Sequence, residues 1–323
     1  MNDGRGEGTC RRRPAPGPRR SFAAGAGSLA WVAPVVLAGC AAPAVPQLPP
    51  ADVSPAQLLE AARAADRRIA AHSPLGVLHQ AVRSAPELEQ PDRHGSGGDS
   101  LLFTGFSLAG HAWRHAVTRA PADLAWVRRS LDGLWLLTRS GAPGVLARCA
   151  HDAAAGEQHG WPHEWRRRVE RGFVHVVPPR ATPRGTALPA TRHYTRTTRD
   201  QLVGLVFGLA VVVAEVREGT LPEALLGDVR AIIDPVVARL DRDRWTILDA
   251  RGENDTNAGG VGGLIRVATL AVWRSVESGR QARYEQARGP LLGLADLGDL
   301  LARGSNLMQY FAWNLRFASA ATV

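Results

Sequence analysis

The sequence predicts an all-α protein in which paired helices form an incomplete ring, after a disordered signal segment and a tether. From residue 55 onward nearly every periodic segment has the apolar spacing of a helix, and alternating strand patterns are nearly absent. The predicted helices also alternate in character, because apolar helices rich in small residues take turns with helices that carry a polar face. An inner set of helices wrapped by an outer set explains this alternation.

The helices follow one another along the chain with one long interruption. The first begins at a Ser-Pro pair, the second is apolar and contains Gly105 and Gly110, and the third carries its charges on one face. Residues 141–196 are rich in Pro, Gly, His and Trp, so this region is expected to be irregular. The expected helices are 55–72, 99–118, 122–140, 197–218, 222–241, 261–278, 281–302 and 305–322.

The helix at 197–218 is the most apolar of these segments. No charged residue occurs between Gln201 and Glu215, so this helix is expected to be buried on all sides. Gly204 and Gly208 lie one turn apart and leave a smooth stripe on its surface. A second helix can therefore approach this stripe closely.

The N-terminal residues are expected to be a targeting signal and not to be part of the fold. Residues 22–39 form a modest apolar run that ends in the sequence LAGC, which resembles a bacterial lipobox. Cys40 would then carry a lipid and become the new N-terminus. The expected organisation is a lipoprotein signal peptide at 1–39, an Ala/Pro-rich tether at 40–54 and the helical domain at 55–323. The sequence thus predicts export and lipid anchoring to the cell envelope, most naturally the outer membrane.

The composition excludes several kinds of chemistry and partner. All 39 basic residues are Arg, so a Schiff-base lysine, a phosphate-loop lysine and a Ser-Lys dyad are impossible. The net charge of +9 is partly carried by residues 1–39, and the remaining arginines are scattered on solvated helix faces. We therefore expect no nucleic-acid partner. Cys149 remains alone once the signal is removed and Cys40 is lipidated, and it is expected to be a small buried hydrophobe.

Polar clusters occur at the starts of the apolar helices. If the inner helices run parallel, these starts meet on one face, where the positive helix ends favour anionic groups. Each cluster can also be read as a helix cap and nothing more. The clusters are Gly98-Asp99-Ser100, Thr198-Arg199-Asp200-Gln201, Glu253 to Asn257, and Ser305-Asn306.

Five sequence blocks resemble the (α/α)-toroid proteins of bacterial envelopes, whose fold is similar to that of glycoside hydrolases and polysaccharide lyases. The resemblance spans roughly residues 95–320 and differs at Ser140, where a threonine is expected in the turn. The eight helices at most also fall short of the twelve of a full ring, so the ring is incomplete or closed by another chain. The blocks are GDSLLFTGFSLAG, LWLLTRSGAPGVLAR, YTRTTRDQLVGLVFGLA, WTILDARGENDTN and SNLMQYFAWNL.

The resemblance and the helix starts together suggest a site directed at a polysaccharide or another envelope glycan. Asp99 and Asp200 would form the carboxylate pair that glycoside hydrolysis needs, and Tyr194 or His193 would relay a proton. The expected substrate-binding residues are Arg148, Arg199, His193, Asp249, Asn254, Asn306 and Trp161, the last by stacking on a sugar ring. An enzyme and a binding module are both compatible with these residues, and so is a scaffold lipoprotein that binds a protein partner.

Two histidine pairs have a spacing that metal sites use. His111 and His115 lie one turn apart, but no glutamate accompanies them as in a zinc protease helix. His159 and His163 have the same spacing, with Pro162 disfavouring a helix between them. We expect packing histidines at the first pair, and no metal or cofactor.

Overall fold

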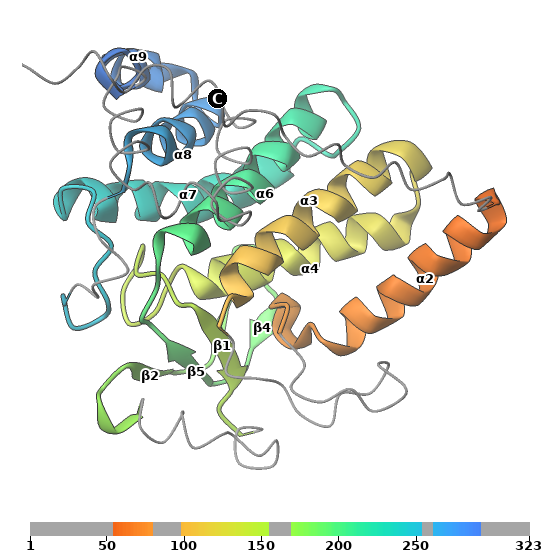
Figure 1. The fold of residues 1–323 in the computed structure, drawn as a ribbon, viewed down its shortest axis with the longest axis horizontal. Helices are drawn as coiled ribbons and strands as arrows, with labels where there is room; N and C mark the ends of the chain where they lie inside the picture. Colours follow the sequence, from red (N-terminus) through yellow and green to blue (C-terminus); the bar gives the residue numbers. More distant parts are fainter. Residues whose placement is uncertain (1–53, 80–97, 155–168, 254–260, 292–323) are drawn as a thin grey trace, which may run out of the picture. The chain divides into compact units, whose positions relative to one another are not determined.

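The computed structural model describes residues 54–79, 98–154, 169–253 and 261–291 (Figure 1). The chain divides into two compact units, Met1–Pro55 and Ala56–Val323, and nearly all described residues belong to the second. They form a mainly-α fold, as the sequence predicts. The α-helices are α2 Pro55–Ala71, α3 Ser100–Thr118, α4 Pro121–Leu137, α6 Arg199–Arg217, α7 Leu225–Arg242, α8 Gly263–Ser275 and α9 Gln281–Leu291. Short 3-10 turns, η1 Pro74–Gly76 and η2 Ser278–Arg280, precede α3 and α9.

Helices α3 and α6 pack against each other at backbone contact distance. A Cβ atom added at Gly105 would lie 1.9 Å from the carbonyl oxygen of Gly204, and one added at Gly208 would lie 2.4 Å from that of Gly105. Leu102 likewise faces Gly204, so the contacts advance along both helices in the same direction and the two run parallel. The close approach predicted for the glycine stripe of α6 is confirmed, and α3 is the partner.

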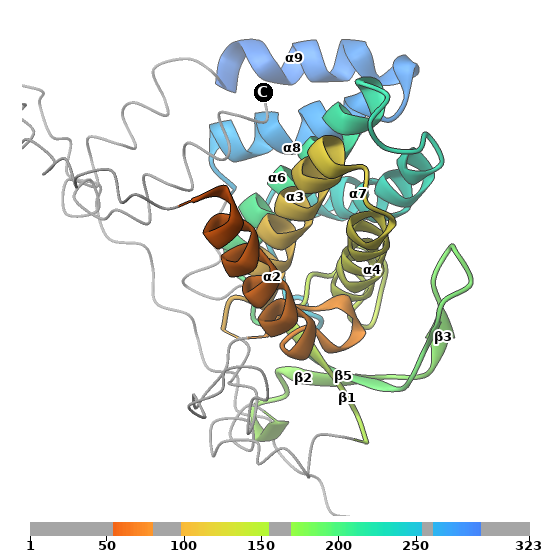
Figure 2. The same cartoon turned by 90° about the vertical axis from the view of Figure 1, so that its right-hand side faces the viewer.

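The remaining helices continue this arrangement as antiparallel hairpins. Helix α4 turns back along α3, since Asp123 near its start pairs with Arg114 near the end of α3. Helix α7 turns back along α6, and α8 then runs parallel to α6, because Arg217 donates to the carbonyl of Ser275 at the end of α8. Helices α3, α6 and α8 therefore lie side by side in one direction, with α4 and α7 in the other (Figures 1 and 2).

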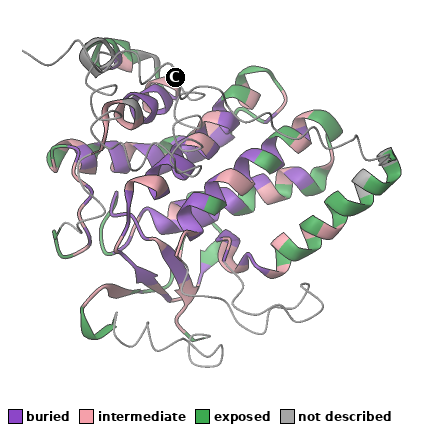
Figure 3. Cartoon of the chain, viewed as in Figure 1, coloured by how far each residue is buried: buried purple, intermediate pink, exposed green. Residues whose placement is uncertain are grey.

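Leucine and valine side chains from all of these helices form one core (Figure 3). Helix α6 contributes a buried run with almost no polar side chain, as its uncharged sequence predicts. The largest fully buried side chains are Leu101, Leu102, Leu108, Leu131, Leu134, Leu136, Leu137, Leu202, Leu205, Leu209 and Leu225. This core holds the starts of α3 and α6 at fixed positions beside each other.

The region expected to be irregular contains two small antiparallel sheets, so the expectation of an all-α chain was wrong here. The first has the strand order β1-β5-β2, with His193 paired to Ala150 on one side and His175 on the other. These strands are four residues long and mix histidine, arginine and threonine with valine. They therefore lack the alternation of apolar and polar residues by which a strand is predicted from sequence. The strands are β1 Cys149–Asp152, β2 Val174–Val177, β3 Arg180–Ala181, β4 Ala187–Leu188 and β5 Thr191–Tyr194.

A tight turn joins α4 to β1. Gly141 and Gly144 have φ angles of 80° and 82°, which favour glycine. A Cβ atom at Gly144 would also lie 2.1 Å from the carbonyl oxygen of Pro235 in α7. The turn therefore packs directly on α7 and directs the following chain, with Arg148, toward the start of α3.

Candidate functional site

The side chain of Gln201 brings the starts of α3 and α6 together. Gln201 is fully buried, and its Oε1 atom accepts a hydrogen bond of 3.1 Å from the backbone N–H of Leu102. Its Nε2 atom donates to Asp99 Oδ1 at 2.9 Å and to Asp200 Oδ2 at 3.4 Å. One amide group thus joins the two carboxylates that the sequence pairs.

The geometry of these two carboxylates follows from their shared donor. Asp99 Oδ1 and Asp200 Oδ2 lie 2.9 Å and 3.4 Å from the same nitrogen atom, so the two carboxylates are close neighbours. The side chain of Asp99 is 38% exposed, so solvent reaches it. Thr198 is the N-cap residue of α6, but its hydroxyl donates to Asp200 instead of capping the helix.

Arg148 approaches the same carboxylates from the start of β1. Its Nη2 atom lies 3.2 Å from Asp99 Oδ1, and its Nε atom donates to the carbonyl of Gly98. The backbone of Arg148 is held on both sides, because its N–H donates to the carbonyl of Tyr194 and its carbonyl accepts from the N–H of Leu101. We call Asp99, Arg148, Thr198, Asp200 and Gln201 the mouth cluster.

Two further predicted residues, Tyr194 and His193, lie in the interior beside the mouth cluster. The Tyr194 side chain is 5% exposed and packs with Cys149 and Phe173, so its backbone carbonyl is its described link to the cluster. Cys149 is buried, as expected for a small hydrophobe. These contacts hold β1 and β5 against the start of α3.

His193 is completely buried in β5. Its Nδ1 atom lies 2.6 Å from the hydroxyl of Ser140 and its Nε2 atom lies 2.8 Å from the hydroxyl of Thr191. The pKa of His193 is lowered to about 3, chiefly by burial and also by the nearby charges of Arg180, His175 and His151. The described contacts of this imidazole are therefore with the turn and the sheet, and none of them joins it to Asp99 or Asp200.

Asp249 organises the loop that follows α7. It is 7% exposed, accepts hydrogen bonds from the backbone N–H groups of Arg251 and Glu253, and pairs with the Arg251 guanidinium at 3.1 Å. That guanidinium lies 4.6 Å from the ring centre of Phe173, and the guanidinium of Arg196 lies 5.1 Å from the same centre. The loop thus packs near the end of the chain segment that leads into α6.

The other predicted site residues divide into two groups. Arg199 is the first residue of α6 and is half-buried next to Asp200. The remaining ones, Cys40, Trp161, Asn254 and Asn306, lie outside the described residues. The structure therefore brings Asp99, Asp200 and Arg148 together, and it does not bring His193 or Asp249 into their described contacts.

Sequence reasoning missed two features of this region. Gln201 was recognised as part of a helix start but not as the donor that links both carboxylates. The sequence feature that could have indicated this role is an uncharged amide directly before a long apolar run. The contacts of Phe173 with the guanidiniums of Arg196 and Arg251 could not be predicted from the sequence. These neighbours come from segments that are distant from Phe173 in the sequence.

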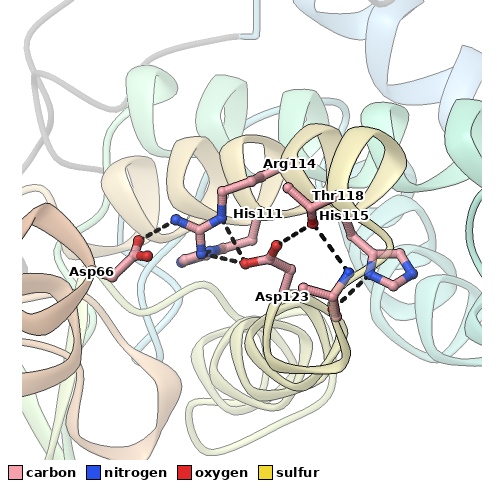
Figure 4. A network of polar contacts seen from close by, with 7 residues as sticks. Asp66, His111, Arg114, His115, Thr118 and Asp123 are labelled. Carbon is pink, nitrogen blue, oxygen red and sulfur yellow. Dashed lines mark hydrogen bonds and ion pairs between the residues drawn. The ribbon is translucent and has the colours of Figure 1, made fainter. Parts of the chain in front are cut away.

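The pair His111 and His115 lies at the other end of α3 and serves packing (Figure 4). His111 stacks on Trp126 with ring centres 5.3 Å apart, whereas His115 Nδ1 contacts the carbonyl of Ala120 at 3.0 Å. Burial lowers the pKa of His111 to about 4, assisted by the charge of Arg114. Among the described residues no three His, Cys, Asp or Glu side chains are grouped as metal ligands.

Arg114 connects three helices beside this pair (Figure 4). It pairs with Asp66 of α2 and with Asp123 of α4, which also accepts a hydrogen bond of 2.7 Å from Thr118. Burial acts to raise the pKa of Asp123, but the hydrogen bonds from Arg114 and Thr118 hold it below its ordinary value. This network fixes the end of α3 opposite to the mouth cluster.

No protein family, curated protein or solved structure matches this chain. Of the helices that the structure describes, none has both the length and the apolar character required to cross a membrane. Fold and site therefore define the chain only as a mainly-α protein with a carboxylate pair at the shared start of two parallel helices.

Proposed function

We propose that this chain is an exported, lipid-anchored envelope protein whose mouth cluster binds or acts on a polysaccharide. The observation that carries the proposal is the pairing of Asp99 and Asp200 by the single amide of Gln201. This amide nitrogen has two N–H bonds, and one carboxylate accepts from each of them. Two carboxylates at hydrogen-bond distance from it, one of them open to solvent, are what sugar hydroxyls and a reacting glycosidic bond require.

The two carboxylates have different surroundings, which is the condition under which such a pair divides its roles. Asp99 faces the guanidinium of Arg148. Asp200 accepts hydrogen bonds from two neutral donors, Thr198 and Gln201. Arg148 is 22% exposed and would also pair with the carboxylate of an acidic sugar. Hydrolysis, lyase chemistry and binding without turnover all use these groups.

We further propose that the hairpins belong to a ring of the (α/α)-toroid kind, similar in fold to glycoside hydrolases and polysaccharide lyases. The parallel course of α3, α6 and α8 supports this arrangement, because it directs successive helix starts to the same side. In this proposal Asn254, Asn306 and Trp161 complete the mouth around Asp99 and Asp200. No cofactor is required for any of the reactions considered.

A glycan-binding screen of the purified full-length protein, followed by turnover assays on each bound glycan, tests the function. In Asp200→Asn the carboxylate charge is lost while the side chain keeps its size. If the protein is an enzyme, we expect turnover to fall by at least about a hundredfold while glycan binding remains. Glu223→Gln, at an exposed position before α7, changes the net charge equally and should have no effect. A protein that binds no glycan in any form would refute the proposal and favour the scaffold that binds a protein partner.

The proposed anchor is tested separately through Cys40. When cells are grown with radioactive palmitate, we expect the wild-type protein to carry the label and the Cys40→Ser variant to lose nearly all of it, because a thiol is the attachment point. Cys149→Ser is the matched control, since that thiol is buried in the fold and should not influence labelling. Equal labelling of the Cys40 variant and the wild type would exclude the anchor and leave the mouth cluster unaffected.

A further inference from the structure

An exposed apolar stripe runs along α3. Phe103, Trp113 and Val117 are 43%, 49% and 85% exposed, although large apolar side chains in this fold are otherwise mostly buried. Together with Phe106 and Gly110 they are spaced by three or four residues, so they share one face of the helix. We call Phe103, Phe106, Gly110, Trp113 and Val117 the α3 stripe.

The α3 stripe continues onto α6. The ring of Phe207 in α6 meets Phe106 edge to face at 5.4 Å and meets Trp113 in the same manner at 5.8 Å. These three rings are arranged with fixed geometry, which differs from the scattered single apolar side chains of an ordinary surface. The described structure therefore contains an ordered aromatic surface that extends over two parallel helices.

Helix α2 borders the same part of α3 without covering it. Asp66 of α2 pairs with Arg114, the residue that follows Trp113. Yet Ala61, Ala62 and Ala65 of α2 are exposed (Figure 3). Two helices joined by an ion pair thus both leave apolar side chains uncovered.

The chain itself contains a segment suited to this surface. Residues 305–322 have the apolar spacing of a helix, with Leu307, Met308, Phe311 and Leu315 on one face. Arg316 is the single charged residue in this segment, so a helix formed here would need partners for most of its surface.

The lengths also agree. A helix over 305–322 would be about 27 Å long, close to the length of α3 with its 19 residues. Residues 292–304, which connect this segment to α9, can span up to about 40 Å when extended. The segment therefore matches α3 in length, and it is joined to α9 by a connection long enough to let it leave that helix.

We propose that residues 305–322 dock as a helix on the α3 stripe and on Phe207. The aromatic rings of Phe103, Trp113 and Phe207 then face Leu307, Phe311 and Leu315, and the apolar surfaces of both partners leave water. Gly110 lies in the middle of the stripe, where an added Cβ atom meets nothing within 4 Å in the described structure, so a second helix finds room to approach. This docking does not require that the mouth cluster binds or acts on a polysaccharide, although it also fixes the position of Asn306.

Limited trypsin digestion of the full-length protein, followed by mass spectrometry, tests the docking through Arg316. A docked helix protects this arginine, whereas Val117→Asp places a charge against the segment and should release it. We expect cleavage after Arg316 to be at least about tenfold faster in Val117→Asp than in the wild type, because cleavage follows the population of the open form. Val176→Asp is the control, since this valine of β2 is also 66% exposed but lies outside the stripe.

A second variant keeps the test decisive if the new charge impairs folding. Gly110→Leu adds a good helix former at an exposed position of α3, so the melting temperature of the described fold should stay the same or rise. The leucine would occupy the space of the docked helix, and we again expect faster cleavage after Arg316. Equal cleavage rates in wild type, Val117→Asp and Gly110→Leu would overturn the proposal. It would also be overturned if these variants converted a dimer to a monomer in sedimentation without changing cleavage, because a second copy of the chain would then cover the stripe.

Discussion

Replacing Gly105 with alanine is expected to destabilise the fold severely. The added Cβ atom would lie 1.9 Å from the carbonyl oxygen and 2.3 Å from the carbonyl carbon of Gly204. Both atoms belong to backbone inside a helix, so neither can rotate away, and α3 and α6 must separate. We expect a loss of about 4 kcal/mol or more in the free energy of unfolding, a large part of the roughly 5 to 15 kcal/mol of a typical domain. Urea unfolding followed by circular dichroism measures this loss.

Gly227→Ala is the matched control for this prediction. Gly227 lies in the first turn of α7, and an added Cβ atom meets nothing within 4 Å. The same chemical change should therefore stabilise the protein by about 0.5 to 1 kcal/mol, because alanine loses less backbone entropy than glycine when a helix forms. If the two variants unfold at the same urea concentration, the close packing of α3 on α6 is not what the fold depends on.

Acidification is expected to destabilise the fold steeply below pH 6.5. The pKa values of His111 and His193 are lowered from 6.5 to about 4 and about 3, chiefly by burial. Both imidazoles are therefore neutral in the folded protein at pH values where the unfolded chain binds protons. Their contribution to stability is fully present above pH 6.5 and is lost as the pH falls toward their pKa values in the folded state. Each group contributes about 1.4 kcal/mol per pH unit, so the two together would remove roughly 4 kcal/mol between pH 6 and 4.5.

His111→Phe separates this effect from general acid denaturation. The phenyl ring can keep the stack on Trp126, and no titrating group remains at this position. We expect the slope of unfolding free energy against pH to decrease by about 1.4 kcal/mol per pH unit between pH 6 and 4.5, whereas the slope above pH 7 stays unchanged. Urea titrations at half-unit pH intervals measure both slopes. An unchanged slope in the acid range would mean that His111 does not resist protonation.

Several parts of the fold could be predicted because their cause is local in the sequence. The uncharged run from Leu202 to Ala214 can only be a buried helix, and the glycines at 204 and 208 leave its surface open to one close neighbour. Asp99 directly precedes α3 and Asp200 lies in the first turn of α6, so the parallel packing of these helices brings the two carboxylates together. Helical periodicity and small residues at a fixed spacing are therefore sufficient for the mainly-α class, whereas the carboxylate pair also requires that the helices run parallel.

The sheet and its histidine could not be predicted in the same way. Strand β5 joins residues from positions 149 to 152 and 174 to 177, and pairing over such separations leaves no periodic mark in four-residue strands. His193 looked available for a proton relay because it lies close to Asp200 in the sequence, but strand pairing directs its ring to Ser140 and Thr191. The low pKa of His193 therefore depends on burial, which arises only when the sheet forms.

By itself, the sequence determined the helical class and the glycine stripe of α6, because each depends on residues within a few turns of one another. The packing of α3 on that stripe depends on segments that are distant in the sequence. Only the tertiary structure decided that Gln201 holds both carboxylates, that Arg148 reaches Asp99 from β1, and that His193 is enclosed. These outcomes depend on the direction in which side chains point after distant segments have packed. Hydrophobic burial drives that packing without regard to direction, whereas hydrogen bonds select among the side chains that it brings close.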